Sequence, residues 1–373
     1  MVTAVVMVGR SQHKILGGGD DPVVWVQGAR RAATRDLLDL LARQPGVERI
    51  ILATPDLDGL ADGPVDRVVQ TAPGAIHTGE QLARIVAEEE IQRLLYLGGG
   101  AAPLLSEQTL TEVVAALTAA EQLVITNNQF ASDWAGITPA ALMAEWVERL
   151  PRDNMFGWVL SAEAGLPVES LEANAESRLD IDTPLDLMVL QLHSRTRPTL
   201  RRYLAGLPLD ITALEQALAL LARPASRVFI AGRVGPDVWE ALNGVTRVWL
   251  RVLAEERGMV SSGRQARGEV TSLLAAHIGA VGMERFFDEL GAWADVAFID
   301  TRVLLAHYGL WPDAATRFAS DLGRVEEVSE PWLRRFTDHA RRSSIPVILG
   351  GHGLMAGDMY ALCDILALRA QAL

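Results

Sequence analysis

Short apolar runs alternate with longer amphipathic stretches along the first half of the chain. Glycine or charged residues bound the runs, which is typical of strands buried in a parallel sheet. The stretches between them have helical spacing, with Leu37, Leu38 and Leu41 on one apolar face. This alternation predicts βαβ units, a doubly wound, mainly parallel sheet and helices on both of its faces. The expected strands are Thr3–Val8, Arg49–Ala53, Leu94–Leu97 and Gln122–Thr126, and the expected helices are Ala29–Leu41, Gly79–Glu89 and Ser106–Ala119.

A polar segment interrupts this pattern at residues 193–198 and ends in Pro198, which predicts a domain boundary. The same alternation then restarts, so we expect a second α/β domain and place the two domains at residues 1–195 and 196–373. In the second, strands are expected at Arg227–Ala231, Arg247–Val252, Asp295–Ile299 and Pro346–Leu349, with helices at Leu200–Leu204, Ile211–Leu221, Val270–Ile278, Met283–Leu290 and Pro331–Arg342.

Composition narrows the class of protein. With 373 residues, of which 49% are hydrophobic and 22% charged, the chain has enough apolar material for two cores, and disorder is excluded. Its 34 basic and 47 acidic residues give a net charge of −13, which argues against a nucleic-acid partner but not against a local site for a small anion. The lone Cys363 lies in an apolar helical pattern, and a single cysteine excludes an intrachain disulfide.

Signals for membrane insertion or export are lacking in the sequence. No apolar run approaches the 18 residues of a membrane span, and the N-terminus has neither the basic start nor the cleavage site of a signal peptide. We therefore expect a cytoplasmic protein without a membrane partner. The nine tryptophans suit either a core or an interface between copies of the chain. The sequence therefore does not decide the oligomeric state, and it leaves a homo-oligomer open.

The most informative segment is LDIDTPLDL at residues 179–187. Thr183, Pro184 and Asp186 fit an N-cap, the first helical position and the third position of a capping box. That explanation leaves out Asp180 and Asp182, whose side chains point to one face of an extended segment. Two converging carboxylates need a cation or hydrogen-bond donors, and their oxygen chemistry suits Mg²⁺. We therefore predict Asp180 and Asp182 as magnesium ligands.

This segment resembles the closing motif of nucleotidyltransferases with a glycosyltransferase-A-like fold, and the similarity is closest to the molybdenum-cofactor and 2-phospho-L-lactate guanylyltransferases. Tyr96–Ser106 resembles the central strand of that family with its Asp-x-Pro-Leu-Leu turn, and Asn154–Val168 resembles the segment before the closing motif. The resemblance covers residues 1–193 and none of the rest. It implies transfer of a nucleotidyl group from an NTP, with GTP favoured, to a small phosphorylated acceptor, with Mg²⁺.

Two positions matter for this resemblance. The central turn of the family supplies an aspartate that binds magnesium, and the matching residue is Ala101, which cannot bind a metal. The family also places a glycine-rich loop and then a lysine after its first strand. Lys14, the only lysine of the chain, is the candidate for phosphate contact, with an ordinary surface lysine as the alternative.

The other residues expected to bind nucleotide lie after expected strands. Those after Gln122–Thr126 include Ser132 and Asp133 as weaker candidates, and an ordinary turn explains this group equally well. Thr78 is expected to cap the helix that begins at Gly79. The predicted nucleotide-binding residues are Gly9, Arg10, Ser11, Gly99, Gly100, Asn127 and Asn128.

Polar clusters also follow three expected strands of the second half, for which we recognise no family. Carboxyl ends of parallel strands share one edge of a sheet, the usual place for a ligand. The candidate site there consists of Arg233, Asp300, Arg302, Gly351 and His352, with His352 as a candidate base. Plain alternatives exist, because Asp300 can cap the following helix and His352 can be structural. A Gly-x-Ser-x-Gly elbow and a Walker phosphate loop are absent.

Three functions follow from these observations. The first is a magnesium-dependent nucleotidyltransferase, in which Asp180, Asp182 and Lys14 act at the reacting phosphates. The second, motivated by Ala101, is a catalytically degenerate domain that binds a nucleotide or serves as a scaffold. The third places ligand binding or chemistry in the second half. We favour the first; the sequence leaves the base, the acceptor and the role of the second domain open.

Overall fold

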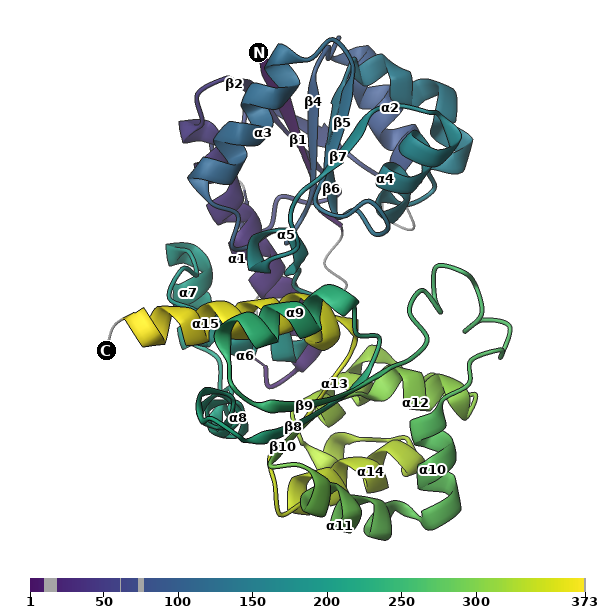
Figure 1. Ribbon diagram of the computed structural model, residues 1–373. Helices are drawn as coiled ribbons and strands as arrows, with labels where there is room; N and C mark the ends of the chain where they lie inside the picture. The colour runs from purple at the N-terminus through teal and green to yellow at the C-terminus, as the bar shows by residue number, and fades with distance from the viewer. Residues whose placement is uncertain (10–18, 61, 73–76, 372–373) are drawn as a thin grey trace. The chain divides into compact units, whose positions relative to one another are not determined.

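Figure 1 shows the computed structural model of the chain, which describes residues 1–9, 19–60, 62–72 and 77–371. The chain divides into two compact units, and each is described by itself. Unit 1 comprises Met1–Gly18, Gln27–Ile181 and Arg195–Leu204, and unit 2 comprises Gly19–Val26, Asp182–Ser194 and Ala205–Leu373. Both units are α/β, as the hydrophobic pattern predicts.

Unit 1 contains a seven-stranded sheet. Its strands are β1 (Val2–Met7), β2 (Val47–Thr54), β3 (Arg67–Gln70), β4 (Leu94–Gly98), β5 (Leu123–Thr126), β6 (Trp134–Thr138) and β7 (Val168–Ser170). They lie in the order β3-β2-β1-β4-β6-β5-β7, and neighbouring strands are parallel except β6, which is antiparallel to both β4 and β5. The pattern predicts β1, β2, β4 and β5, but not β3, β6 and β7, which are only three to five residues long.

Helices cover both faces of this sheet (Figure 1), because successive side chains of a strand point to opposite faces. Ala4 and Val6 of β1 belong to the core beneath α1 (Pro22–Arg43) and α3 (Glu107–Ala119). Val5 belongs to the core on the other face, beneath α2 (Thr78–Glu88) and the 3₁₀ segment η1 (Ala140–Arg149). The further helical elements are η2 (Asp153–Met155), α4 (Phe156–Trp158), η3 (Val159–Glu163), α5 (Ala175–Arg178) and α7 (Pro198–Ala205).

The order in which strands join this sheet reverses at β1. Strands β2 and β3 lie on one side of β1, whereas β4, the next strand along the chain, lies on its other side. In open parallel sheets a crevice forms at such a reversal point, beyond the carboxyl ends of the two strands. The fold therefore predicts a ligand site beyond Met7 of β1 and Gly98 of β4.

Unit 2 contains a parallel four-stranded sheet, and the sequence pattern predicts all four of its strands. These are β8 (Arg227–Gly232), β9 (Trp249–Ala254), β10 (Val296–Asp300) and β11 (Val347–Gly350), and they lie in the order β11-β10-β8-β9.

Helices cover both faces of the unit 2 sheet as well (Figure 1). The helical elements are α6 (Pro184–Leu192), α8 (Thr212–Ala222), α9 (Pro236–Val245), α10 (Leu273–Val281), α11 (Met283–Trp293), α12 (Thr301–His307), α13 (Ala314–Asp321), η4 (Val325–Glu327), α14 (Pro331–Arg342), η5 (Leu354–Asp358) and α15 (Met359–Gln371). Helices α10, α11 and α14 pack on one face around Phe286 and Phe336, and α6, α8, α9 and α15 lie on the other.

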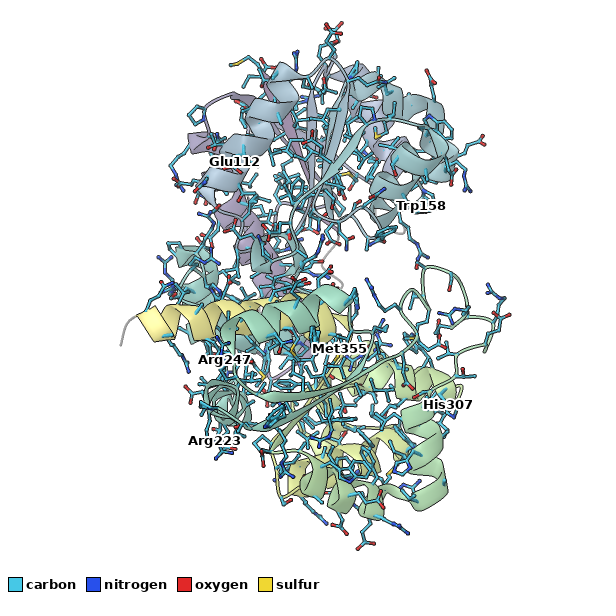
Figure 2. All side chains as sticks on the ribbon, viewed as in Figure 1. Glu112, Trp158, Arg223, Arg247, His307 and Met355 are labelled. Carbon is cyan, nitrogen blue, oxygen red and sulfur yellow. The ribbon has the colours of Figure 1, made fainter. Side chains whose placement is uncertain are left out.

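The interior of unit 2 includes the segment that follows β11. Met355 of η5, labelled in Figure 2, is fully buried, and so is Asp358. Cys363 of α15 is also buried, as its apolar surroundings in the sequence predict, and burial raises the pKa of its thiol to about 12. This thiol is therefore protonated at neutral pH and has no nucleophilic character. Among the described residues, no helix is long and apolar enough to cross a membrane.

Candidate functional site

A cavity of about 240 Å³ lies at the reversal point of the unit 1 sheet. The ends of β1 and β4, the turn after β4 and the residue before β6 form its walls. Two carboxylates and one guanidinium group lie along these walls beside a glycine-rich turn, where the topology predicts a ligand. The lining residues are Met7, Val8, Gly9, Arg30, Thr78, Tyr96, Gly98, Gly99, Ala101, Asp133 and Asp180.

The turn Gly98–Gly100 passes close to the end of β1. The Gly99 amide donates to the Met7 carbonyl at 2.7 Å, and a Cβ atom on Gly99 would lie 2.9 Å from Val8 Cγ2. Gly100 has a φ of 90°, and a Cβ atom there would lie 2.6 Å from Arg30 Cγ. These glycines therefore allow close packing. Of the predicted nucleotide-binding glycines, Gly9 and Gly99 line the cavity, whereas Gly100 packs on Arg30.

Replacing Gly99 by alanine is expected to lower the free energy of unfolding by about 1–3 kcal/mol, because the new methyl group forces the turn away from β1. The same displacement should weaken any ligand bound in the cavity. Gly244→Ala is the control, since a Cβ atom at this position of α9 meets no atom within 4 Å. Urea unfolding checks the effect, and a Gly99→Ala protein as stable as the control would contradict this packing.

Ala101 lies directly opposite Asp180, with which it forms an isolated antiparallel bridge. The position at which the resembled family carries a metal-binding aspartate is thus a methyl group here, next to the first aspartate of the closing motif. The segment after Asp180 is held by α1, because Arg30 Nε donates to the Ile181 carbonyl at 2.5 Å. Asp180 also accepts from the Ile181 amide at 2.8 Å.

Asp133, in the turn after β5, supplies the second carboxylate of the cavity. Its carbonyl accepts from the Gly98 amide at 3.2 Å, which places it beside the end of β4. Asn127 Nδ2 donates to Asp133 Oδ2 at 2.8 Å and to the Ser177 carbonyl at 3.0 Å, and Asn127 Oδ1 accepts from the Asp133 amide at 2.9 Å. Asn127 therefore positions Asp133. Neither Asn127 nor Asn128 is a lining residue of the cavity.

Arg30 and Thr78 also line the cavity, although the sequence gives no reason to expect a ligand there. Arg30 lies within an ordinary amphipathic helix pattern. Thr78 is predicted from the sequence to cap α2, but this prediction is wrong. His77 is the N-cap, and its Nδ1 accepts from the Glu80 amide at 3.3 Å.

Asp182 belongs to unit 2, in the segment that begins α6. The expected interactions of Asp186 at the start of this helix are present, since its Oδ2 accepts from the amides of Asp182 at 2.7 Å and Thr183 at 2.6 Å. Asp186 is fully buried; burial and the neighbouring Asp358 and Asp182 carboxylates raise its pKa well above the ordinary value. The role of Asp180 and Asp182 as magnesium ligands stays a prediction.

Arg10, Ser11 and Lys14 lie outside the described residues. Within the described ranges, no group of three or more His, Cys, Asp or Glu side chains is arranged to hold a metal ion. A cation in this cavity would therefore take at most two carboxylates from the described chain and the rest of its oxygens from a ligand or water.

The predicted rim of unit 2 contains two buried ion pairs. Arg233 Nε and Nη2 donate to Asp300 at 2.6 and 3.1 Å, and Asp300 caps α12 by accepting from the Arg302 amide at 3.1 Å. Arg302 in turn donates to both oxygens of Asp321 at 2.5 and 2.6 Å and to the Gly350 carbonyl at 3.2 Å. The Arg302 side chain is only 6% exposed, so it serves to hold the rim together.

The charges of this rim shift each other's pKa values. Burial raises the pKa of Asp300, but the charge and hydrogen bonds of Arg233, together with the charge of Arg302, act in the opposite sense, and the net pKa is lowered. His352 keeps an exposed face, yet the protein atoms crowded around it remove much of its hydration. This desolvation, with the charge of Arg233, lowers the pKa of His352 to about 4. The imidazole is therefore neutral at pH 7 and can donate or accept a hydrogen bond.

Comparison with known proteins gives likenesses to solved structures only. No family model matches the chain, and no curated protein matches it. It is similar to a cytidylyltransferase from Leptospira borgpetersenii, with 16% identity, a TM-score of 0.39 and coverage of 54% of this chain and 91% of that one. It is also similar to a putative nucleotide-diphospho-sugar transferase from Desulfovibrio desulfuricans, with 15% identity, a TM-score of 0.40 and coverage of 56% and 99%. A third similar structure is a 4-diphosphocytidyl-2C-methyl-D-erythritol synthase, with 13% identity, a TM-score of 0.34 and coverage of 51% of this chain and 96% of that one.

Proposed function

We propose that unit 1 is a nucleotidyltransferase domain that binds a nucleoside triphosphate in the cavity at its reversal point and transfers the nucleotidyl group to a small phosphorylated acceptor. The observation that carries this proposal is the convergence of Asp133, Asp180 and Arg30 on the glycine-rich turn at the ends of β1 and β4. The resemblance of the closing motif supplies the reaction class and GTP as the favoured donor.

The proposed reaction is an in-line displacement at phosphorus. An oxygen of the acceptor phosphate forms a bond to the α-phosphorus, the bond from that phosphorus to the oxygen bridging to the β-phosphate breaks, and pyrophosphate leaves. Such a step needs positioning and charge neutralisation from the protein. The Gly98–Gly99 backbone lets phosphate oxygens approach closely, and Arg30 adds positive charge at the same wall.

The two carboxylates of the cavity fit a magnesium ion, which binds proteins through one or two carboxylates together with substrate phosphates. We assign Asp180 and Asp133 as its ligands, with Asp133 in place of the aspartate that the resembled family carries at the position of Ala101. The bound ion would neutralise charge that develops on the phosphates. Asn127 keeps Asp133 in place for this role through its two hydrogen bonds.

A thermal-shift panel of ATP, GTP, CTP and UTP, each with and without Mg²⁺, tests the proposal. A ligand at 100 times its Kd adds about 2.7 kcal/mol to the free energy of unfolding, which is roughly 5–11 °C for a unit of this size. We expect a magnesium-dependent shift that is largest with GTP. If no nucleotide shifts the melting temperature of the folded protein, nucleotide binding in unit 1 is contradicted. A shift that is largest with another nucleotide would contradict the guanine preference.

A catalytically degenerate nucleotide-binding domain is the second candidate function, and Ala101 is the observation that favours it. Ala101 lies opposite Asp180, so Ala101→Asp would add a carboxylate beside the existing one. If magnesium-dependent nucleotide binding appears only in the Ala101→Asp variant, the native cavity is a degenerate site. Equal magnesium dependence in the native chain supports the assignment of Asp133 instead.

A further inference from the structure

The sheet of unit 2 has a reversal point of its own. Strand β9, which follows β8 in the chain, lies on one side of β8, whereas β10 lies on the other. The carboxyl ends of β8 and β10 are Gly232 and Asp300, and both are buried. A Cβ atom on Gly232 would lie 2.2 Å from Asp300 Cβ, so glycine allows the two strand ends to approach. The same topological rule as in unit 1 therefore predicts a ligand crevice here.

Arg233 follows β8 directly and is held rigidly at this point. Its ion pair with Asp300 uses Nε and one N–H of Nη2, and the two side chains are only 11% and 0% exposed. A guanidinium group carries five N–H donors, so three are left once Asp300 has accepted two. An arginine fixed by a buried carboxylate presents these donors without losing side-chain freedom on binding.

Arg257 and His352 follow the carboxyl ends of two other strands of this parallel sheet, β9 and β11. Arg257 lies in the loop after β9, with its Cζ 3.7 Å from where a Cβ atom on Gly235 would lie. Its side chain is exposed, and among the described residues its guanidinium makes no hydrogen bond or ion pair. His352 comes two residues after Gly350, the residue of β11 that pairs with Asp300 at the end of β10. Desolvation and the charges of Arg233 and Arg257 lower the pKa of His352, whereas the Asp300 and Asp182 carboxylates raise it. Three donor groups thus follow strand ends along one edge of the sheet.

We propose that this edge of unit 2 binds a small molecule through its phosphate group, with Arg233, Arg257 and His352 as the donors. A tetrahedral phosphate offers oxygens in several directions and can accept from three separate groups, whereas a carboxylate offers two oxygens in one plane. Arg302 is not a member of this set, because Asp321 and Gly350 occupy its donors. The proposal does not depend on the function proposed for unit 1.

Binding of inorganic phosphate to the full chain, followed by phosphorus NMR line broadening, tests this site. Arg257→Ala is expected to weaken phosphate binding about tenfold or more, since it removes a charge-assisted contact. Arg247→Ala is the matched control: Arg247 is exposed and precedes β9, at the opposite end of that strand (Figure 2), and its loss should leave binding unchanged. Acetate at equal concentration should compete poorly.

Arg233→Lys is a second test of the site. Lysine keeps a positive charge beside the buried Asp300 but lacks the several N–H donors of the guanidinium group. We expect this variant to fold, as its unfolding curve will show, and to bind phosphate more weakly. Phosphate binding that is unaffected by both Arg257→Ala and Arg233→Lys overturns the proposal and assigns the signal to another part of the chain. Equal competition by acetate overturns the assignment of phosphate as the ligand group.

Discussion

Asp180→Asn is expected to abolish the magnesium dependence of nucleotide binding and to lower nucleotidyl transfer about 100-fold or more. The asparagine side-chain amide has the size of the carboxylate but lacks its charge. We therefore expect the fold to stay intact while the cavity loses a cation ligand. Nucleotide affinity measured with and without Mg²⁺ checks the first effect, and pyrophosphate release checks the second. The unfolding curve of the variant shows whether the protein remains folded.

Asp133→Asn should have the same effect as Asp180→Asn if both side chains hold one ion. Asp62→Asn provides the matched control, because Asp62 is an exposed residue of unit 1 that does not line the cavity. A full response to Mg²⁺ in Asp133→Asn would contradict its assignment in place of the aspartate missing at Ala101. The nucleotide proposal itself would stand in that case as long as Asp180→Asn loses the response.

Arg302→Ala is expected to cost about 3–5 kcal/mol of stability. The substitution leaves the Asp321 carboxylate, which is 0% exposed, without its cation. It also removes donors to Thr301 at 2.8 Å and to the Gly350 carbonyl. Urea unfolding measures the loss, and a variant within about 1 kcal/mol of the native protein would contradict this account.

Two further measurements test whether the unpaired Asp321 charge causes this loss of stability: its pH dependence and the stability of a double variant. Burial already raises the pKa of Asp321 despite Arg302, and without Arg302 it should rise further. A folded-state pKa above the unfolded value means that stability falls as pH rises through that range, so the deficit should be largest near pH 7 and shrink near about pH 4. The double variant Arg302→Met, Asp321→Leu should recover much of the loss.

Local patterns predict much of this fold because they reflect local physical requirements. The apolar runs of β1, β2, β4 and β5 are buried along most of their length, and so are β8, β10 and β11 of unit 2, whereas β9 is mostly exposed. The segments that the pattern misses have another origin. Strand β6 is fully buried and as long as β4, but it lies between β4 and β5 and is antiparallel to both. That placement depends on its neighbours in the sheet and not on its own residues.

The site is less predictable because its members come from distant segments. Asp180 stands out in a motif, but its bridge to Ala101 is a tertiary contact that no local spacing contains. The sequence makes Asp133 a weaker ligand candidate that an ordinary turn explains equally well, and it makes Arg30 one polar position of a helix. Only the reversal of strand order brings them to one cavity. In unit 2, Arg302 looks like a ligand-binding residue, although the structure gives its donors to Asp321 and Gly350.

The most direct test of the central claim is a crystal structure of the chain with a non-hydrolysable GTP analogue and Mn²⁺, whose anomalous scattering locates the ion. We expect phosphates over the Gly98–Gly99 turn and the ion bound by Asp180 and Asp133. A nucleotide bound elsewhere, or an ion away from both carboxylates, would contradict the assignment of this cavity as the nucleotidyl-transfer site.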